Sequence, residues 1–314
     1  LAVPREYQRR MSAHRAAARA LAASLSASLD GAPSSSAPSP NASLSPPRSA
    51  GLARAAQRLL RGQPVRVHVV GGSAAAGAGG AGVNATFDAL LVAGLNRAVG
   101  AAEPAAGRAL GRFVRTSLSQ GGTSSLWASL MGEALHGRPP HVLVWEYAIN
   151  DHSLAVEAAA TNAGSADATM RFMVERWLRR SLALRPPPAL CLAYLWDKLP
   201  AAPFKPGNRA LCRRMPVAGS AYDAQRPVLA HYLARGADLT AFSAAHDVND
   251  RLGSRAFCPL IADSYFHPSA AGHRHVADAL GSLLLRQLVA ELGRGDEGSA
   301  AALPASAALH PAAP

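Results

Sequence analysis

Four residues, spread widely along the chain, supply the groups that acyl transfer requires. Ser73 follows the apolar run 65–70 and two glycines, and His267 lies near the end of the chain. Between them come Gly121, in a glycine- and serine-rich segment, and Asn150, after the apolar run 141–147. A serine hydroxyl attacks a carbonyl carbon when a histidine accepts its proton, and amide N–H groups hold the oxyanion that forms. These residue types point to hydrolysis or transfer of an acyl group.

Each of these motifs, taken alone, also has an ordinary structural interpretation. A serine after Gly71 and Gly72 is a small residue in a tight turn. Asn150 and Asp151 both favour turns and are typical of a strand end. His267 and the proline after it fit the entry to a helix. Only the ordered set of motifs favours catalysis.

The ordered set resembles the SGNH hydrolases, also called GDSL-type esterases and lipases, over about residues 65 to 292. The resemblance implies that Ser73 is the nucleophile and His267 its base. It also implies an oxyanion hole built from the backbone N–H groups of Ser73 and Gly121 and the side-chain amide of Asn150. The expected activity is a serine esterase acting on an acyl or acetyl ester of a carbohydrate or lipid. An O-acyltransferase and a catalytically inactive binding protein are the alternatives.

Three positions depart from the family pattern. Gly72 stands in the middle of Gly-Gly-Ser, where the family has Gly-Asp-Ser, and the family's asparagine before the block glycine is missing at Gly121. The family's acid usually lies three residues before the histidine, and Ser264 occupies that position. Asp263 lies four residues before His267, and we expect it to orient the imidazole. If the Asp263 carboxylate does not reach the imidazole, the site is a Ser-His dyad or is inactive.

Strands and helices alternate between these motifs, which predicts a parallel sheet joined by right-handed crossovers. The resemblance implies an α/β fold, a flavodoxin-like three-layer α/β/α sandwich around a mostly parallel five-stranded sheet. Apolar runs predict strands at 65–70, 112–117, 141–147, 189–196 and 238–242. Apolar residues at helical spacing predict helices at 51–61, 86–99, 124–136, 168–184, 225–234 and 270–292. We expect loops at 152–167 and 197–224 to shape the substrate pocket.

The chain divides by composition into three parts: an arm at 1–50, a catalytic domain at 51–293 and a disordered tail at 294–314. Residues 5–29 are rich in Arg, Ala and Ser, which resembles an organelle transit segment. Residues 31–49 are rich in Pro and Ser, which is typical of a linker. We therefore interpret the arm as disordered or targeting. The location of the protein is left open, with the secretory pathway, the extracellular space or an organelle lumen favoured.

The net charge of +12 invites a nucleic-acid interpretation, but its distribution argues against one. Residues 1–61 hold nine arginines against two acidic residues, while the rest of the chain has 23 basic and 18 acidic residues. Aromatic residues make up only 5% of the sequence, too few to interleave with the arginines as base-stacking surfaces do. We expect no nucleic-acid partner and no membrane span. The oligomeric state is left open.

Two competing motifs fail on position. The segment Gly77–Gly82 fits the dinucleotide fingerprint G-x-G-x-x-G, yet it begins seven residues past the strand at 65–70, and no acid closes a second strand about 20 residues on. The α/β-hydrolase motif G-x-S-x-G fails because residue 75 is alanine. A nicotinamide cofactor is therefore not expected.

The remaining ionisable and sulfur-containing residues indicate no cofactor or metal. His273 and His275 lie two apart on a predicted helix and so point in different directions. We expect Glu146 to pair with a nearby arginine. Cys191 fits core packing, whereas Cys212 and Cys258 fit a single disulfide if the compartment is oxidising.

Overall fold

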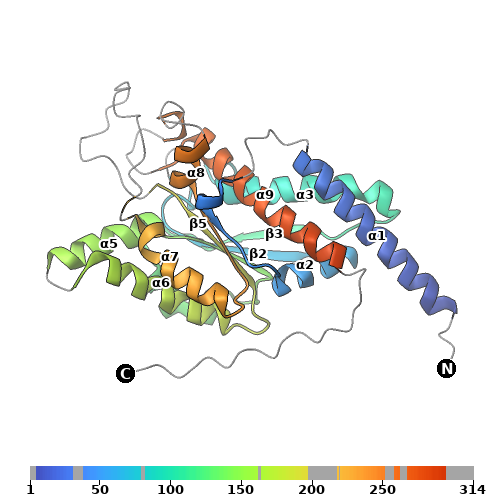
Figure 1. Ribbon diagram of the computed structural model, residues 1–314, viewed down its shortest axis with the longest axis horizontal. Helices are drawn as coiled ribbons and strands as arrows, with labels where there is room; N and C mark the ends of the chain where they lie inside the picture. Colours follow the sequence, from blue (N-terminus) through green and yellow to red (C-terminus); the bar gives the residue numbers. More distant parts are fainter. Residues whose placement is uncertain are drawn as a thin grey trace.

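A six-stranded sheet forms the centre of the computed structural model (Figure 1), which describes residues 5–30, 38–78, 82–161, 164–196, 218, 220–251, 258–261 and 267–294. The strands are β1 (Ser43–Leu44), β2 (Val65–Gly71), β3 (Phe113–Ser117), β4 (Val142–Glu146), β5 (Ala189–Tyr194) and β6 (Leu239–Ser243). Their spatial order is β1-β6-β5-β4-β2-β3. The strands from β2 to β6 pair in parallel, and β1 pairs antiparallel with β6.

The central strands are buried along nearly their whole length because helices cover both of their faces. Every residue of β4, β5 and β6 is buried, and so are all residues of β2 except Arg66. A strand buried on both faces reads as a continuous apolar run, without the alternation of a half-exposed strand. This pattern confirms the predicted mostly parallel α/β sheet.

Helices form a layer on each side of the sheet (Figure 1). One core cluster joins the sheet to α1 (Arg5–Asp30), α2 (Ala50–Leu60), α3 (Phe87–Ala106), α8 (Ala244–Arg251) and α9 (Ala270–Arg294). The other joins it to α4 (Ser125–Met131), α5 (Ala148–Ala160), α6 (Ala166–Leu182) and α7 (Ala221–Ala234). The three-layer α/β/α sandwich is therefore confirmed.

The sheet has one strand more than expected. Ser43 and Leu44 pair antiparallel with Phe242 and Ala241, which adds a two-residue strand to the edge formed by β6. These residues fall in the segment interpreted as a linker. Asp247 and Asp250 of α8 hold it in place: Asp247 accepts a bond from the Ser39 N–H at 2.8 Å, and Asp250 one from the Ser39 hydroxyl at 2.5 Å.

Part of the arm at 1–50, which was expected to be disordered or targeting, is folded. Residues 5–30 form α1, which packs on α3 and α9 (Figure 1). Ala17, Leu21 and Leu25 lie four residues apart on one face of α1, and each is at most 1% exposed. This apolar stripe buries α1 against the domain, so the interpretation as an unfolded arm is wrong for residues 5–30. The predicted tail begins near the last described residue, Arg294.

Two further helices are not among those predicted from the sequence. α5 covers most of the predicted loop at 152–167, and α8 follows β6 directly. Most of the second predicted pocket loop, 197–224, lies outside the described residues, and its last residues open α7. In the part of the chain that the structure describes, no helix combines the length and apolar character that a membrane crossing requires.

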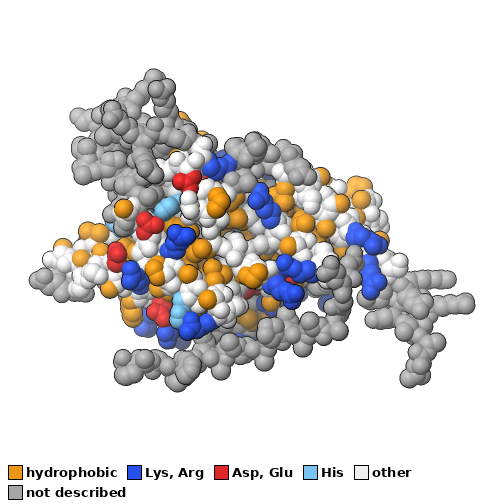
Figure 2. Space-filling view, in the orientation of Figure 1, with side chains coloured by type: hydrophobic (Ala, Val, Ile, Leu, Met, Phe, Trp, Pro, Cys, Tyr) orange, Lys and Arg blue, Asp and Glu red, His pale blue; other side chains and the backbone are white. Residues whose placement is uncertain are grey.

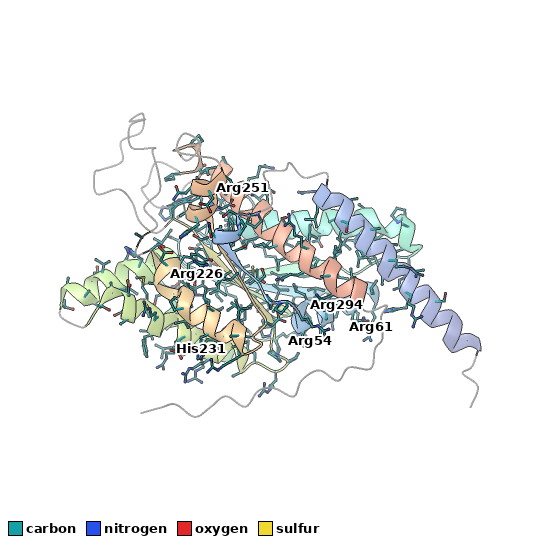
Figure 3. The ribbon with its side chains drawn as sticks, viewed as in Figure 1. Arg54, Arg61, Arg226, His231, Arg251 and Arg294 are labelled. Carbon is teal, nitrogen blue, oxygen red and sulfur yellow. The ribbon has the colours of Figure 1, made fainter. Side chains whose placement is uncertain are left out.

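Basic side chains are dispersed over the face that Figure 2 shows, where they lie in separate groups among apolar and uncharged atoms. The labelled residues of Figure 3 lie in α2, α7, α8 and α9, except Arg61, which is the C-cap of α2. Several have partners within the chain. The guanidinium of Arg54 donates to the carbonyl of Pro187, and Arg294 donates to Glu291 at 2.6 Å.

Candidate active site

Ser73 lies on a tight turn directly after β2. The N–H of Gly72 donates to the carbonyl of Glu146 at 2.8 Å, which ties the turn to the end of β4. Beyond the serine, the N–H of Ala78 donates to the Ser73 carbonyl at 2.9 Å. The Ser73 side chain is half-buried at the carboxyl edge of the sheet. In open α/β sheets this edge is where ligands bind.

His267 lies beside Ser73, although 194 residues separate them in sequence. The distance from Ser73 Oγ to His267 Nε2 is 2.8 Å, within hydrogen-bond reach. The histidine stands just before α9, whose first turn is capped by the hydroxyl of Ser269, accepting from Gly272 N–H at 3.2 Å. A Cβ at Gly272 would collide with the carbonyl of Leu260, so the start of α9 packs directly on that segment.

The Gly121 segment follows β3 and passes next to the serine. The N–H of Gln120 donates to the carbonyl of Gly71 at 3.0 Å, which holds the segment against β2. A Cβ at Gly121 would lie 3.8 Å from the Cβ of Ser73. That distance is an ordinary van der Waals contact, so packing within the protein does not require glycine at position 121. The expected role of the Gly121 N–H in an oxyanion hole stays a prediction.

Asn150 lies in the first turn of α5, with its side chain against the serine turn. A Cβ at Gly72 would lie 2.6 Å from the Asn150 Oδ1. The Asn150 amide therefore occupies space that any side chain at position 72 would need. This contact gives a physical reason for the glycine in the middle of Gly-Gly-Ser. Ser73, Gly121 and Asn150 thus follow three neighbouring strands, β2, β3 and β4.

Asp151 links the start of α5 to the start of α4. Its two carboxylate oxygens accept from the N–H of Ser125 at 2.8 Å and from the Ser125 hydroxyl at 2.5 Å. The indole N–H of Trp145 donates to the same hydroxyl at 2.8 Å. Burial raises the pKa of Asp151 to about 7. The sequence motif identified this aspartate only as a turn former.

Glu146 corrects the expectation of an arginine partner. Its side chain is 1% exposed, and Oε2 accepts from the backbone N–H of Ala75 at 3.2 Å. Burial, together with the nearby charges of Asp151 and Asp88, raises the pKa of Glu146 to about 8, although backbone bonds from Ala75 and Gly72 oppose the shift. A buried carboxyl therefore lies beneath the serine turn. A polar residue inside an apolar strand was the only sequence signal for it.

Several predicted residues lie outside the described part of the chain. Asp263, the expected third member of the triad, is one of them, and so is Cys212, which leaves its pairing with Cys258 a prediction. Cys191 is a buried free thiol. His273 and His275 have different partners: His273 accepts from Phe87 N–H at 3.1 Å, and His275 lies 3.1 Å from Asp247. Among the described residues, no three His, Cys, Asp or Glu side chains gather as metal ligands do.

Comparison with solved structures identifies the fold. Two crystal structures of a two-domain esterase active on acetylated mannans match at 18% identity with TM-scores of 0.53 and 0.52, one of them determined with mannopentaose. The matches cover 77% and 76% of this chain but only 55% and 53% of theirs, so the chain spans about half the length of that esterase. A putative GDSL-like lipase from Parabacteroides merdae matches more weakly, at 14% identity over 70% of this chain and 96% of that one, with a TM-score of 0.46. The chain shares the fold of that esterase, which supports the SGNH-type fold expected from the motifs.

The resemblance carried by the four sequence motifs is thus confirmed at the level of the fold. At the level of sequence, no protein-family model and no curated protein matches the chain. The roles of individual side chains therefore rest on the geometry described above.

Proposed function

We propose that this chain is a serine esterase in which Ser73 is the nucleophile and His267 the general base. The observation that carries the proposal is the distance of 2.8 Å between Ser73 Oγ and His267 Nε2 at the carboxyl edge of the sheet. A base within this range can take the hydroxyl proton directly. Histidine suits the role because its ordinary pKa, near 6.5, lets it accept and return a proton near neutral pH.

The first half-reaction forms an acyl-enzyme. Ser73 Oγ bonds to the ester carbonyl carbon while its proton moves to Nε2 of His267, and the carbonyl π electrons move onto oxygen. The N–H groups of Ser73 and Gly121 and the side-chain amide of Asn150 hold this oxyanion. When the intermediate collapses, the bond to the leaving oxygen breaks, and the alcohol takes the proton from His267.

The second half-reaction repeats these steps with water. The histidine takes a proton from water, whose oxygen attacks the acyl carbon, and the same amides hold the second oxyanion. Collapse releases the carboxylic acid and returns the proton to Ser73. For Nε2 to accept a proton, Nδ1 must carry the imidazole hydrogen. We propose that Asp263 accepts a hydrogen bond from that N–H and so selects the tautomer.

We propose acetyl esters of carbohydrates as the first substrate class to test. The proposal rests on the mannan esterase named above, which shares the fold and, by its name, acts on acetylated polysaccharides. An O-acyl group on a sugar hydroxyl is an oxygen ester. The two half-reactions described above hydrolyse such an ester without any further catalytic group. A lipid ester is the competing class within the same reaction type.

The test combines a covalent probe with turnover. A fluorophosphonate should label the wild-type protein at Ser73, and p-nitrophenyl acetate and acetylated mannan should be hydrolysed. Ser73→Ala should abolish labelling and turnover, and His267→Ala should reduce both strongly. Asn150→Ala should lower kcat by ~10²–10³ with little change in KM, because that amide acts on the oxyanion.

A matched control is available on the same helix as Asn150. Ser153 lies three residues further along α5, and its hydroxyl donates to the carbonyl of Ile149 at 3.0 Å. Ser153→Ala should leave labelling and turnover at wild-type values. Labelling that survives Ser73→Ala, or a wild-type protein with neither labelling nor turnover, would contradict the esterase proposal and favour an inactive binding protein.

A further inference from the structure

The buried carboxyl of Glu146 supports the turn that carries Ser73. Glu146 makes two contacts with this turn, one before Ser73 and one after it. Before it, the N–H of Gly72 donates to the Glu146 carbonyl at 2.8 Å. After it, the N–H of Ala75 donates to the side-chain Oε2 at 3.2 Å. The backbone and side chain of Glu146 thus fix both ends of a four-residue turn.

The turn lies so close to Glu146 that no side chain fits between them. A Cβ at Gly71 would lie 2.9 Å from the Glu146 carbonyl oxygen, 3.2 Å from the Glu146 Cβ and 2.6 Å from the Ala75 Cβ. The glutamate is 1% exposed, and its carboxyl contacts the backbone of the turn at Ala75. It is therefore a positioning residue, which acts on the reaction through Ser73.

The charges around Glu146 all disfavour its ionised form. Asp151 on α5 and Asp88 on α3 are the charged groups that interact with it. Asp88 is itself fully buried and pairs with Arg115 at 2.6 Å, so its negative charge is partly neutralised. A further negative charge at this buried place costs free energy, because little water is present to solvate it.

We propose that Glu146 works as a neutral carboxyl that holds the Ser73 turn, and that its ionisation at alkaline pH lowers turnover. The proposal rests on the esterase function proposed above. A neutral carboxyl accepts the Ala75 N–H without adding charge. An ionised one places a negative charge beneath the site where the oxyanion forms, and like charges in a buried site repel strongly.

The proposal predicts different pH profiles of kcat for Glu146→Gln and Asp151→Asn. With p-nitrophenyl acetate and Ser73→Ala as the blank, wild-type kcat should fall by roughly tenfold between pH 7 and pH 9.5. Glu146→Gln keeps an acceptor for Ala75 N–H but cannot ionise. It should keep KM, retain kcat at pH 7 within about threefold, and lose the alkaline fall. Asp151→Asn should retain the fall but move it to lower pH, because it leaves Glu146 in place and removes a charge that disfavours its ionised form.

Two outcomes of the pH profiles would overturn the proposal. One is a Glu146→Gln profile that follows the wild-type profile through the alkaline range. The other is an alkaline fall that disappears in Asp151→Asn and persists in Glu146→Gln, which would assign the titration to Asp151. Because Glu146→Gln has the same shape as the native side chain, a change in pH profile is not explained by a loss of packing.

Hydrogen exchange at Ala75 tests the positioning contact without any substrate. In Glu146→Ala the Ala75 N–H loses its acceptor, so its exchange should speed up by tenfold or more relative to the amides of β5, whereas Glu146→Gln should stay near wild type. Equal relative exchange in all three proteins would overturn the positioning role. This measurement separates the two proposals: a protein without esterase activity still reports whether Glu146 holds the turn.

Discussion

At the scale of single residues, Gly72 sets the position of the Asn150 amide by having no side chain of its own. A Cβ at position 72 would lie 2.6 Å from Oδ1 and 3.0 Å from Cγ of Asn150. Both distances are shorter than van der Waals contact, so any other residue must displace the amide. The contact depends on a side-chain direction, and a sequence pattern does not contain that information. From the sequence alone, Gly72 was therefore only a departure from the family's Gly-Asp-Ser pattern.

We predict that Gly72→Ala impairs catalysis much more than folding. The end of the Asn150 side chain can rotate away, so the free energy of unfolding should change by less than about 1 kcal/mol. The displaced amide no longer faces the oxyanion, so kcat should fall by roughly 10–100-fold. Urea unfolding and p-nitrophenyl acetate kinetics measure the two effects. Gly94→Ala, at a helix position where only Arg97 comes within 4 Å, is the control and should keep wild-type kcat. Wild-type turnover in Gly72→Ala would show that Asn150 does not need its present position.

At the scale of elements, the buried strands were predictable and two helices were not. β5 is an unbroken apolar run and β4 is apolar up to Glu146, and the end of β4 brings Asn150 beside the turn that follows β2. α5 was missed because its N-cap residue, Tyr147, makes no side-chain capping bond and turn-forming residues occupy its first turn. α1 was missed because its arginines outweighed the apolar stripe of Ala17, Leu21 and Leu25. In both cases tertiary packing, rather than a local signal, stabilises the helix.

The bond between α5 and α4 should contribute measurably to stability. Asp151→Ala removes the acceptor of the Ser125 N–H and hydroxyl, and both donors lie in a buried region. Buried donors without partners cost about 1–3 kcal/mol, and that loss in the free energy of unfolding is the expected result. Asp167→Ala is the matched control, because Asp167 is exposed and lies 3.9 Å from Arg171. Its effect should stay below about 0.5 kcal/mol. An Asp151→Ala protein as stable as the control would show that the link is not needed.

The packing of α1 on α3 and α9 gives a second prediction at this scale. Leu21 is 0% exposed, so Leu21→Ala removes buried methyl groups and leaves a cavity. Such changes typically cost about 2–5 kcal/mol, which chemical denaturation will detect. Ala16→Ser changes an exposed position on the same helix and should have little effect. If the two variants are equally stable, α1 does not dock on the domain as described.

At the scale of the whole molecule, buried acids and buried histidines oppose each other in their effect on stability. Burial raises the pKa of Glu146 to about 8 and that of Asp151 to about 7, so the folded protein keeps protons that the unfolded chain has released. Stability therefore falls as pH rises from about 4.5 towards 8. Burial lowers the pKa of His68, His141 and His273 to about 4, so the unfolded chain holds protons that the folded protein lacks. From these groups stability rises between about pH 4 and 6.5.

The sum of the two sets predicts maximum stability near pH 6.5. Below that value the histidines with a lowered pKa outweigh the acids with a raised pKa, and above it the acids dominate, so stability declines on both sides. Each group contributes up to about 1.4 kcal/mol per pH unit within its window. Between pH 6.5 and 8.5 we expect the free energy of unfolding, measured by urea denaturation, to fall by roughly 2 kcal/mol. The double variant Glu146→Gln, Asp151→Asn should remove that alkaline decline and keep the acidic one, since its histidines are unchanged. A decline of equal size in both proteins would mean that the two buried carboxyls are already ionised at neutral pH.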